Sequence, residues 1–349
     1  MPDQRYPPLI EFTRGGIVES IHYGAIAIVD VLGNIIASYG NPESTVFMRS
    51  AAKPLQALPF VQAGGIAHFN LELEDLALMC GSHSGTPDHT RVASRIQQKI
   101  GCSENDLLCG VHNPFHRPSS DALKLSGQSP TPNHHNCSGK HSGMLAHARL
   151  KQYDIEDYIN LQHPIQQSIV TTLGEMCQCL REEIITGIDG CSVPNFALPL
   201  HKAAMGYAKL CDPGQFSPDR LLACRKITAA MTSHPFMVGG PDRFDTRIME
   251  VGGDKIISKV GAEGYQAIGL LTDALRPGSP ALGIAIKIAD GDIANRARSI
   301  VALEVLRQLG AFTPDQLSQL SEYDFKPIVN SRSIEVGEIR PYFALDIKI

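Results

Sequence analysis

The sequence predicts an α/β (α+β) protein whose central, mainly antiparallel sheet is built from both chain ends around a helical insert. Three observations predict this class. Strand patterns occur near the N-terminus, helical patterns prevail in the middle, and short apolar runs bounded by glycine, proline and aspartate return near the C-terminus. We therefore expect one sheet formed by the two ends of the chain, with the residue clusters of interest at its edge.

The N-terminal part predicts a hairpin followed by a helix. Residues 24–31 are mostly small or β-branched, and residues 35–39 return after a glycine-containing turn. Residues 50–64 then read as a helix, which tolerates Pro54 only in its first turn. Ser50 is thus expected near a helix N-terminus, where backbone N–H groups favour a developing negative charge.

The rest of the chain predicts a helical middle and a strand-rich end. Residues 71–231 are mainly helical in pattern, with Pro/Gly-rich interruptions at residues 112–118 and 130–136. Short apolar runs predict strands at residues 255–260, 266–272 and 281–289. They are followed by an amphipathic helix over residues 293–309 and a final strand pair over residues 326–339, turning near Val336-Gly337.

Length and composition favour a single large unit. The chain has 349 residues, of which 43% are hydrophobic and 19% charged, so it can bury a large core. We expect residues 1–349 to form one unit with two subregions. The sheet subregion takes about residues 1–70 and 240–349, and the mainly helical subregion takes about residues 71–239.

Charge and cysteine usage exclude several classes of protein. The formal net charge is −5 without long runs of one sign, so nothing indicates binding to nucleic acid or to an anionic membrane. The sequence has neither a secretory h-region nor an apolar run of membrane-spanning length. Nine scattered cysteines predict reduced thiols rather than a disulfide framework. We expect a soluble, cytoplasmic protein.

The first chemical motif is Ser50-x-x-Lys53, preceded by Arg49. Residues three apart share one face of a helical turn, and a lysine of lowered pKa can take the proton of a serine. Arg49 is a candidate source of the positive field that would lower this pKa. The alternative interpretation is an ordinary helix start with Ser50 as the cap and Lys53 in solvent.

Two further motifs supply a second serine and a second lysine. Ser82 lies between Gly81 and Gly85, where a turn could expose its hydroxyl beside backbone N–H groups that stabilise an oxyanion. The alternative is a polar turn that caps the next helix. Lys259 lies near a predicted strand end before a glycine turn and could present its amine beside the first serine. Ser-x-x-Lys with a later Lys-x-Gly occurs in serine β-lactamases and penicillin-binding proteins.

Two cysteine-containing segments raise the question of a metal. Residues 136–143 bring together a thiol, an amine, an imidazole and two hydroxyls, and Cys191 follows about fifty residues later. Two cysteines with one or two nitrogen or oxygen donors suit zinc. The alternative is a pair of buried small hydrophobic side chains, which is the usual fate of free cysteine.

Nearly the whole chain resembles one known family, the Rhizobium etli-type L-asparaginases (class 3, or asparaginase II family). The resemblance begins at residues 14–20 and rests on seven motifs in order. They are Arg49-Ser50-Ala51-Ala52-Lys53-Pro54, Ser82-His83-Ser84-Gly85, Asn136-Cys137-Ser138-Gly139-Lys140-His141, Asp189-Gly190-Cys191-Ser192-Val193-Pro194, Val238-Gly239-Gly240, Lys259-Val260-Gly261-Ala262-Glu263-Gly264 and Val336-Gly337-Glu338-Ile339-Arg340-Pro341.

The resemblance implies hydrolysis of L-asparagine to L-aspartate and ammonia by a homodimer with a fold like serine β-lactamases and glutaminases. It implies two Ser-Lys tandems, Ser50 with Lys53 and Ser82 with Lys259. It also implies a zinc held by Cys137, Lys140 and Cys191. The substrate pocket would include Arg49 and His141, with Asp189 behind the metal ligands.

Chemical reasoning agrees with amide hydrolysis but leaves several roles open. The reaction needs an activated nucleophile, an oxyanion site and a proton donor for ammonia. We expect Ser50 to be the nucleophile, with exchanged roles for Ser50 and Ser82 as an alternative. A zinc-activated water is a further alternative, and a zinc that only tunes substrate affinity is preferred. Competing functions are another serine acyl hydrolase (glutaminase, β-lactamase or esterase) and a zinc-bound binding module without turnover.

Overall fold

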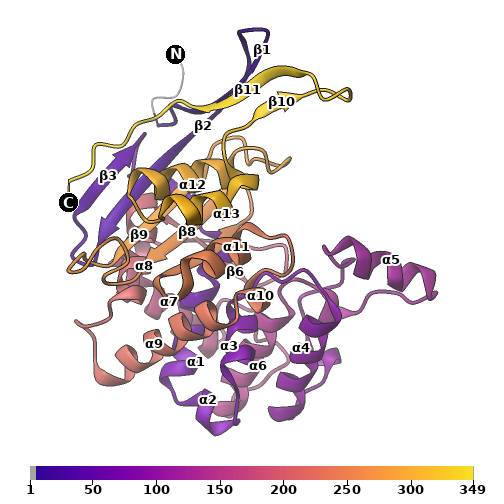
Figure 1. The fold of residues 1–349 in the computed structure, drawn as a ribbon. Coiled ribbons are helices and arrows are strands. Elements are labelled where there is room, and N and C mark those ends of the chain that lie inside the picture. Colours follow the sequence, from indigo (N-terminus) through magenta and orange to yellow (C-terminus); the bar gives the residue numbers. More distant parts are fainter. Residues whose placement is uncertain (1–4, 349) are drawn as a thin grey trace.

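The computed structural model describes residues 5–348 (Figure 1). Its strands are β1 (Pro8–Arg14), β2 (Ile17–Asp30), β3 (Ile35–Tyr39), β4 (Thr45–Phe47), β5 (Ile185–Ile188), β6 (Pro194–Pro199), β7 (Ile256–Gly261), β8 (Tyr265–Leu270), β9 (Leu282–Ile288), β10 (Pro327–Val329) and β11 (Glu335–Pro341). Its helices are α1 (Lys53–Gln62), α2 (Gly65–His68), α3 (Leu73–Cys80), α4 (Pro87–Lys99), α5 (Arg117–Leu125), α6 (Ser138–Leu150), α7 (Pro164–Cys177), α8 (Leu200–Cys211), α9 (Pro218–Ser233), α10 (Pro235–Val238), α11 (Phe244–Gly252), α12 (Arg298–Gln308) and α13 (Pro314–Gln319).

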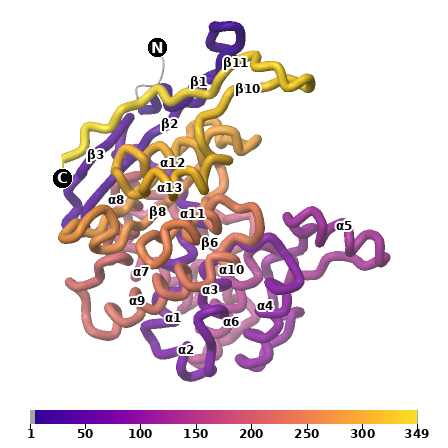
Figure 2. Tube along the Cα trace, viewed as in Figure 1, coloured from indigo at the N-terminus to yellow at the C-terminus, as the bar shows by residue number. Residues whose placement is uncertain are grey.

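The predicted sheet built from both chain ends is confirmed. Its strand order is β10-β11-β1-β2-β9-β8-β7, with β3 also paired to β2, and all these pairings are antiparallel. The indigo start of the chain and its yellow end lie side by side where β1 meets β11 (Figure 2). The sheet thereby places β7, which carries Lys259, at its edge, with β9 and β8 between β7 and β2.

Alternate side chains of β2 enter two different cores on the two faces of the sheet. Ala25 and Ala27 belong to the core that continues into the helical layer, whereas Ile26 and Ile28 belong to the core that includes α12. The small residues allow α8 to approach the sheet closely. At Gly283 in β9, an added Cβ would lie 1.7 Å from the backbone oxygen of Ala204 in α8, so only glycine fits there.

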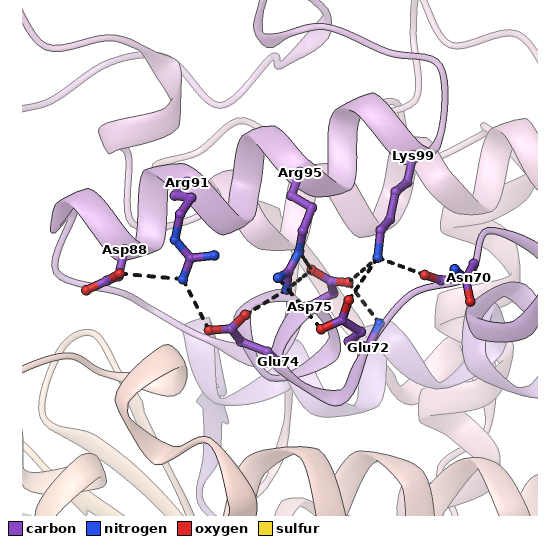
Figure 3. A network of polar contacts seen from close by, with 8 residues as sticks. All are labelled: Asn70, Glu72, Glu74, Asp75, Asp88, Arg91, Arg95 and Lys99. Atoms are coloured by element: carbon purple, nitrogen blue, oxygen red, sulfur yellow. Dashed lines mark hydrogen bonds and ion pairs between the residues drawn. The ribbon is translucent and has the colours of Figure 1, made fainter.

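The helical layer lies below the sheet in Figure 1. Within this layer, charged side chains join α3 to α4 (Figure 3). The fully buried Asp75 carboxylate accepts hydrogen bonds from Arg95, at 2.6 and 2.8 Å, and from the backbone N–H of Glu72 at 2.8 Å. Lys99 Nζ approaches the other side of the same carboxylate at 3.4 Å. The network sets the position of α3, whose C-terminal end leads directly into the loop of Ser82.

Several sequence predictions about elements need correction. Val336-Gly337 is not a turn: Gly337 lies inside β11, where an added Cβ would be 1.8 Å from the Thr13 backbone oxygen. The glycine permits close approach of strands, and the chain turns at residues 330–334 instead. The expected helix over residues 293–309 begins only at Arg298.

Other differences concern strands and the start of the first long helix. Strand β1 and the small sheet β4-β6-β5 were not predicted, and β5 and β6 interrupt the otherwise helical middle. Ser50 lies in a short 3-10 helix, Arg49–Ala52, and α1 follows with Pro54 in its first turn as expected. All nine cysteines are free thiols. Within residues 5–348, the helices are all too short or too polar to cross a membrane.

Candidate active site

The two lysines predicted for catalysis meet at one hydroxyl, that of Ser82. Lys53 Nζ and Lys259 Nζ each lie 2.8 Å from Ser82 Oγ. Lys53 begins α1, Ser82 follows α3, and Lys259 lies on β7, so three separate elements build the contact. The predicted proximity of Lys259 to Ser82 is confirmed across 177 residues of sequence.

The expected hydrogen bond between Lys53 and Ser50 is not formed. Lys53 is only 1% exposed, and its amine reaches the backbone oxygens of Gly81 at 2.6 Å and Asn136 at 3.3 Å besides Ser82. A buried amine needs an acceptor for each N–H, and these two carbonyls supply acceptors. Among the described residues the Ser50 hydroxyl has no hydrogen-bond partner, so the first tandem is not a direct pair.

Both serines nevertheless line one cavity of about 300 Å³. That size suits a small amino acid. The wall also includes Asn136, Glu263, Asp292, Arg243 and Arg298, which bring polar and charged groups to the same space. A second cavity of about 1040 Å³ adjoins the first, because Phe115, Arg243, Asn295 and Arg298 line both.

The environment of the two lysines favours their neutral form. Complete burial lowers the pKa of Lys53 below its usual 10.5, although the thiols of Cys137 and Cys191 oppose this shift. Burial also lowers the pKa of Lys259 well below 10.5, and the charges of Lys53 and Arg243 add to the effect against that of Asp245. A neutral lysine amine has two N–H groups and one lone pair. Lys53 can therefore donate to both carbonyls and accept the proton of Ser82.

Asp245, on α11, supports Lys259 from behind and was missed by sequence reasoning. Its fully buried carboxylate accepts hydrogen bonds from Ser258 Oγ at 2.7 Å, the Val260 N–H at 2.8 Å and Gln266 Nε2 at 2.9 Å. Burial acts to raise the pKa of Asp245, but the charges of Lys259 and Arg298 and these hydrogen bonds lower it overall. The residues that interact with Asp245 lie far from it in sequence, on β7, β8 and α12. No local sequence motif therefore marks Asp245.

The three residues expected to hold zinc are buried and close together. Lys140 Nζ lies 2.8 Å from Cys191 Sγ. A hydrogen bond from Cys191 holds the pKa of the Cys137 thiol well below its usual 9.0, and the same contact raises the pKa of Cys191. Although burial acts to lower it, the two thiols raise the pKa of Lys140. Two sulfurs and one amine thus form a donor set that zinc accepts once the amine loses its proton.

The zinc hypothesis depends on this lysine. Within residues 5–348, no group of three or more His, Cys, Asp and Glu side chains is arranged to hold a metal ion. The neighbouring His141 has one ring nitrogen that forms no hydrogen bond among the described residues. Its Nδ1 lies 2.7 Å from the Tyr158 hydroxyl, while its buried Nε2 has no hydrogen-bond partner. Burial lowers the pKa of His141 well below 6.5, so the ring is neutral and one nitrogen remains to bind a ligand.

Arg49 links the serine loop to the cysteine loop. Its Nε donates to Asp189 Oδ1 at 2.9 Å, and its backbone N–H donates to Asn195 Oδ1 at 3.0 Å. The backbone of Arg49 has φ +52°, a left-handed conformation that costs energy for a residue with a side chain. These two contacts, from the loop and strand that follow β5, hold the strained turn beside Ser50. Asn195 and Tyr158 are further site residues without a sequence signal.

Comparisons with known proteins add one strong match and several distant ones. A family model described as L-asparaginase II matches residues 10–341. No curated protein matches the chain significantly. Among solved structures, a Bacillus glutaminase is similar at 12% identity and TM-score 0.38, covering 83% of this chain and 92% of that one. A Bacillus subtilis glutaminase in covalent complex with 5-oxo-L-norleucine is similar at 11% identity and TM-score 0.37, covering 82% and 86%. Family assignment rests on the family model alone.

Proposed function

The chain belongs to the L-asparaginase II family, and from this premise we propose that it hydrolyses the side-chain amide of L-asparagine to L-aspartate and ammonia. The observation that carries the proposal is the meeting of two buried lysine amines at Ser82, in a cavity also lined by Ser50. Amide hydrolysis requires a nucleophile, a base and a proton donor. Two serines and two lysines of lowered pKa supply these groups without further residues.

In the proposed reaction Ser50 is the nucleophile. Its oxygen lines the cavity and is not engaged in a hydrogen bond, so it is free to attack the amide carbon. As Ser50 attacks, its proton passes to Ser82, with which it forms no hydrogen bond in this structure, and Ser82 passes its own proton to a neutral lysine. A protonated lysine returns a proton to the leaving nitrogen as the C–N bond breaks. Ammonia leaves, and water then hydrolyses the ester on Ser50 by the same proton path in reverse.

The geometry restricts where an oxyanion can be stabilised. The backbone N–H of Ser82 donates to the Val238 oxygen at 2.8 Å, so it is not available for this purpose. Ser50 lies in the first turn of the Arg49–Ala52 3-10 helix. The N–H groups of Arg49 and Ala51 donate to Asn195 Oδ1 and the Met48 oxygen, whereas that of Ser50 has no partner among the described residues. We assign the oxyanion site to this turn.

Ser82 as the nucleophile is the competing assignment. It is favoured by one specific observation, the direct contact of Ser82 Oγ with both lysine amines, one of which could act as base and the other as acid. Against it, Ser82 is only 3% exposed. The two assignments predict covalent adducts on different peptides.

We further propose that Cys137, Lys140 and Cys191 hold one zinc ion. When bound, zinc would hold the loop before α6 and orient the substrate, so that it tunes affinity more than it supplies the nucleophile. Elemental analysis of purified protein should find about one zinc per chain, and Cys137→Ser and Cys191→Ser should each lose it with the fold intact. Undiminished zinc in both variants would show that the site is elsewhere. Chelation should raise KM more than it lowers kcat.

The assay that tests the function measures ammonia release from L-asparagine and from L-glutamine. We expect L-asparagine to have the higher kcat/KM, since the 300 Å³ cavity is small. Preference for L-glutamine, for nitrocefin or for p-nitrophenyl esters would instead assign a different serine acyl hydrolase. Zinc and amino-acid binding without ammonia release would assign a binding module.

Assembly and location stay predictions from the sequence. The family resemblance implies a homodimer, which we propose for this chain. Light scattering coupled to size-exclusion chromatography would measure twice the mass of one chain. A cytoplasmic location is likewise proposed from the sequence and awaits a localisation experiment.

A further inference from the structure

Two arginines at the junction of the two cavities have no role in the proposed reaction. Arg243 and Arg298 line both the 300 Å³ cavity that contains the serines and the adjoining 1040 Å³ cavity. They come from separate elements, Arg243 from the residue before α11 and Arg298 from the start of α12. The seven family motifs include neither of them.

Neither guanidinium group forms an ion pair with a carboxylate among the described residues, although the charges of Asp245 and Asp292 act on Arg298. Among the described residues, the Arg243 side chain forms no hydrogen bond or ion pair, and its guanidinium lies 6.0 Å from the ring centre of Phe115. Arg298 is 8% exposed, and its side chain donates a hydrogen bond only to Gln266 Oε1. A buried guanidinium normally satisfies its five donors. The unused N–H groups therefore call for an acceptor in the cavity.

The acidic side chains that line the same cavity are already engaged or exposed. Asp292 accepts hydrogen bonds from the backbone N–H groups of Arg296, Ala297 and Arg298 at 2.8 to 3.1 Å. Glu263 is 62% exposed and lies 3.9 Å from Arg49. The buried Asp245 carboxylate offsets part of the charge of Arg298. Arg243 forms no ion pair among the described residues, so positive charge remains at the junction.

From these contacts we propose that Arg243 and Arg298 bind the α-carboxylate of the substrate and so restrict the enzyme to free α-amino acids. This inference rests on the proposed function and names the substrate class of the same site. Two guanidinium groups offer a carboxylate paired, charge-assisted hydrogen bonds, and stacking of Arg243 on Phe115 orients its planar donors. A carboxylate bound here leaves the side-chain amide within the cavity of Ser50 and Ser82.

The test compares L-asparagine with β-alaninamide, which is the same molecule without its α-carboxylate. Wild-type protein should prefer L-asparagine by about 100-fold or more in kcat/KM. Arg243→Gln and Arg298→Gln should each lower kcat/KM for L-asparagine about 10- to 100-fold more than they lower kcat/KM for β-alaninamide, because both substrates use the same lysines and only one carries the α-carboxylate. Arg298→Lys, which keeps the charge, serves where Arg298→Gln does not fold.

Arg296→Gln is the matched control. Arg296 lines only the larger cavity, where its guanidinium lies 4.0 Å from the ring centre of Phe12. It should leave the ratio between the two substrates unchanged. Equal losses on both substrates in the Arg243 and Arg298 variants, or no loss on L-asparagine, would overturn the carboxylate assignment.

A second measurement distinguishes failure of the proposed function from failure of the carboxylate inference. If wild-type protein released no ammonia from L-asparagine, the function would be wrong, and calorimetric binding of L-aspartate and β-alanine would decide the carboxylate inference. These ligands differ by the same group. Weaker L-aspartate binding in Arg243→Gln, with β-alanine unchanged, would support the inference, and equal binding of L-aspartate by both proteins would refute it.

Discussion

Ser82 shares its hydroxyl oxygen with two lysine amines, and this arrangement limits their protonation. Two ammonium groups at 2.8 Å from one oxygen would repel each other in a buried, weakly screened environment. At least one amine is therefore expected to be neutral, and it is the base in the proposed reaction. The N–H groups of a neutral Lys53 donate to two backbone carbonyls, which leaves its lone pair to accept the proton of Ser82.

The serine roles can be separated by mutation and trapping. Ser50→Ala should lower kcat at least about 1000-fold because the nucleophile is lost, and Ser82→Ala about 100- to 10,000-fold because the proton path is lost. A diazo-ketone analogue of L-asparagine should form an adduct on the Ser50 peptide, measured by mass spectrometry. Retention of more than about a tenth of the activity in Ser50→Ala, or an adduct on Ser82, would give Ser82 the nucleophile's role.

The lowered lysine pKa values predict a specific pH dependence. A base must be neutral, and neutral lysine is present only above its pKa, so kcat/KM should fall as pH falls through a midpoint below 10.5. Lys53→Arg and Lys259→Arg should be nearly inactive, because arginine keeps the charge but cannot become neutral. The exposed Lys255→Arg is the control and should keep full activity. A kcat/KM that rises as the pH falls from about 10 would contradict a lysine base, because protonation removes the form that accepts a proton.

At the scale of elements, α3 positions Ser82 and is itself held by α4. The buried Asp75 joins Arg95, Lys99 and the first turn of α3, as Figure 3 shows. Removal of one member of a buried ion pair leaves the other charges without compensation. The stability of the catalytic loop therefore depends on residues that do not contact the cavity.

Substitution at this network should affect stability strongly. Asp75→Ala should lower the free energy of unfolding by about 3 kcal/mol, since it removes both the ion pair and the helix cap. Asp88→Ala is the control, because Asp88 is 62% exposed and its contact with Arg91 is 3.5 Å long, so about 0.5 kcal/mol or less is expected. Chemical denaturation measures both. Equal effects of the two substitutions would show that the network does not hold α3.

Elements with a clear hydrophobic pattern in the sequence were predicted well. Features that depend on contacts between strands were not. β2, β3 and the three strands before α12 follow from apolar runs and turn residues. Gly337 was misinterpreted, because a glycine needed for close approach to Thr13 looks the same in sequence as a turn glycine. The partner of Lys53 was also wrong, because it depends on where the loops of Gly81 and Asn136 lie in space.

At the scale of the whole molecule, the site is assembled where the sheet meets the helical layer. β7, which carries Lys259, lies at the opposite edge of the sheet from the paired chain ends and pairs with β8. The helices α1, α3 and α6 of the helical layer (Figure 1) bring the serine and cysteine loops to Lys259. The resemblance to a known family, which rests on seven motifs in order, was needed to anticipate which loops meet. The junction arginines and Asp245 could not be anticipated, because their significance comes from the cavity and from burial, which only the fold creates.

The central claim is that this serine–lysine cavity hydrolyses L-asparagine. The most direct measurement is steady-state ammonia release by purified wild-type protein with L-asparagine and L-glutamine, each run beside a Ser50→Ala/Ser82→Ala double variant. We predict a kcat/KM for L-asparagine at least about tenfold above that for L-glutamine, and no release by the double variant. Release that persists in the double variant, or equal or greater turnover of L-glutamine, would contradict the account.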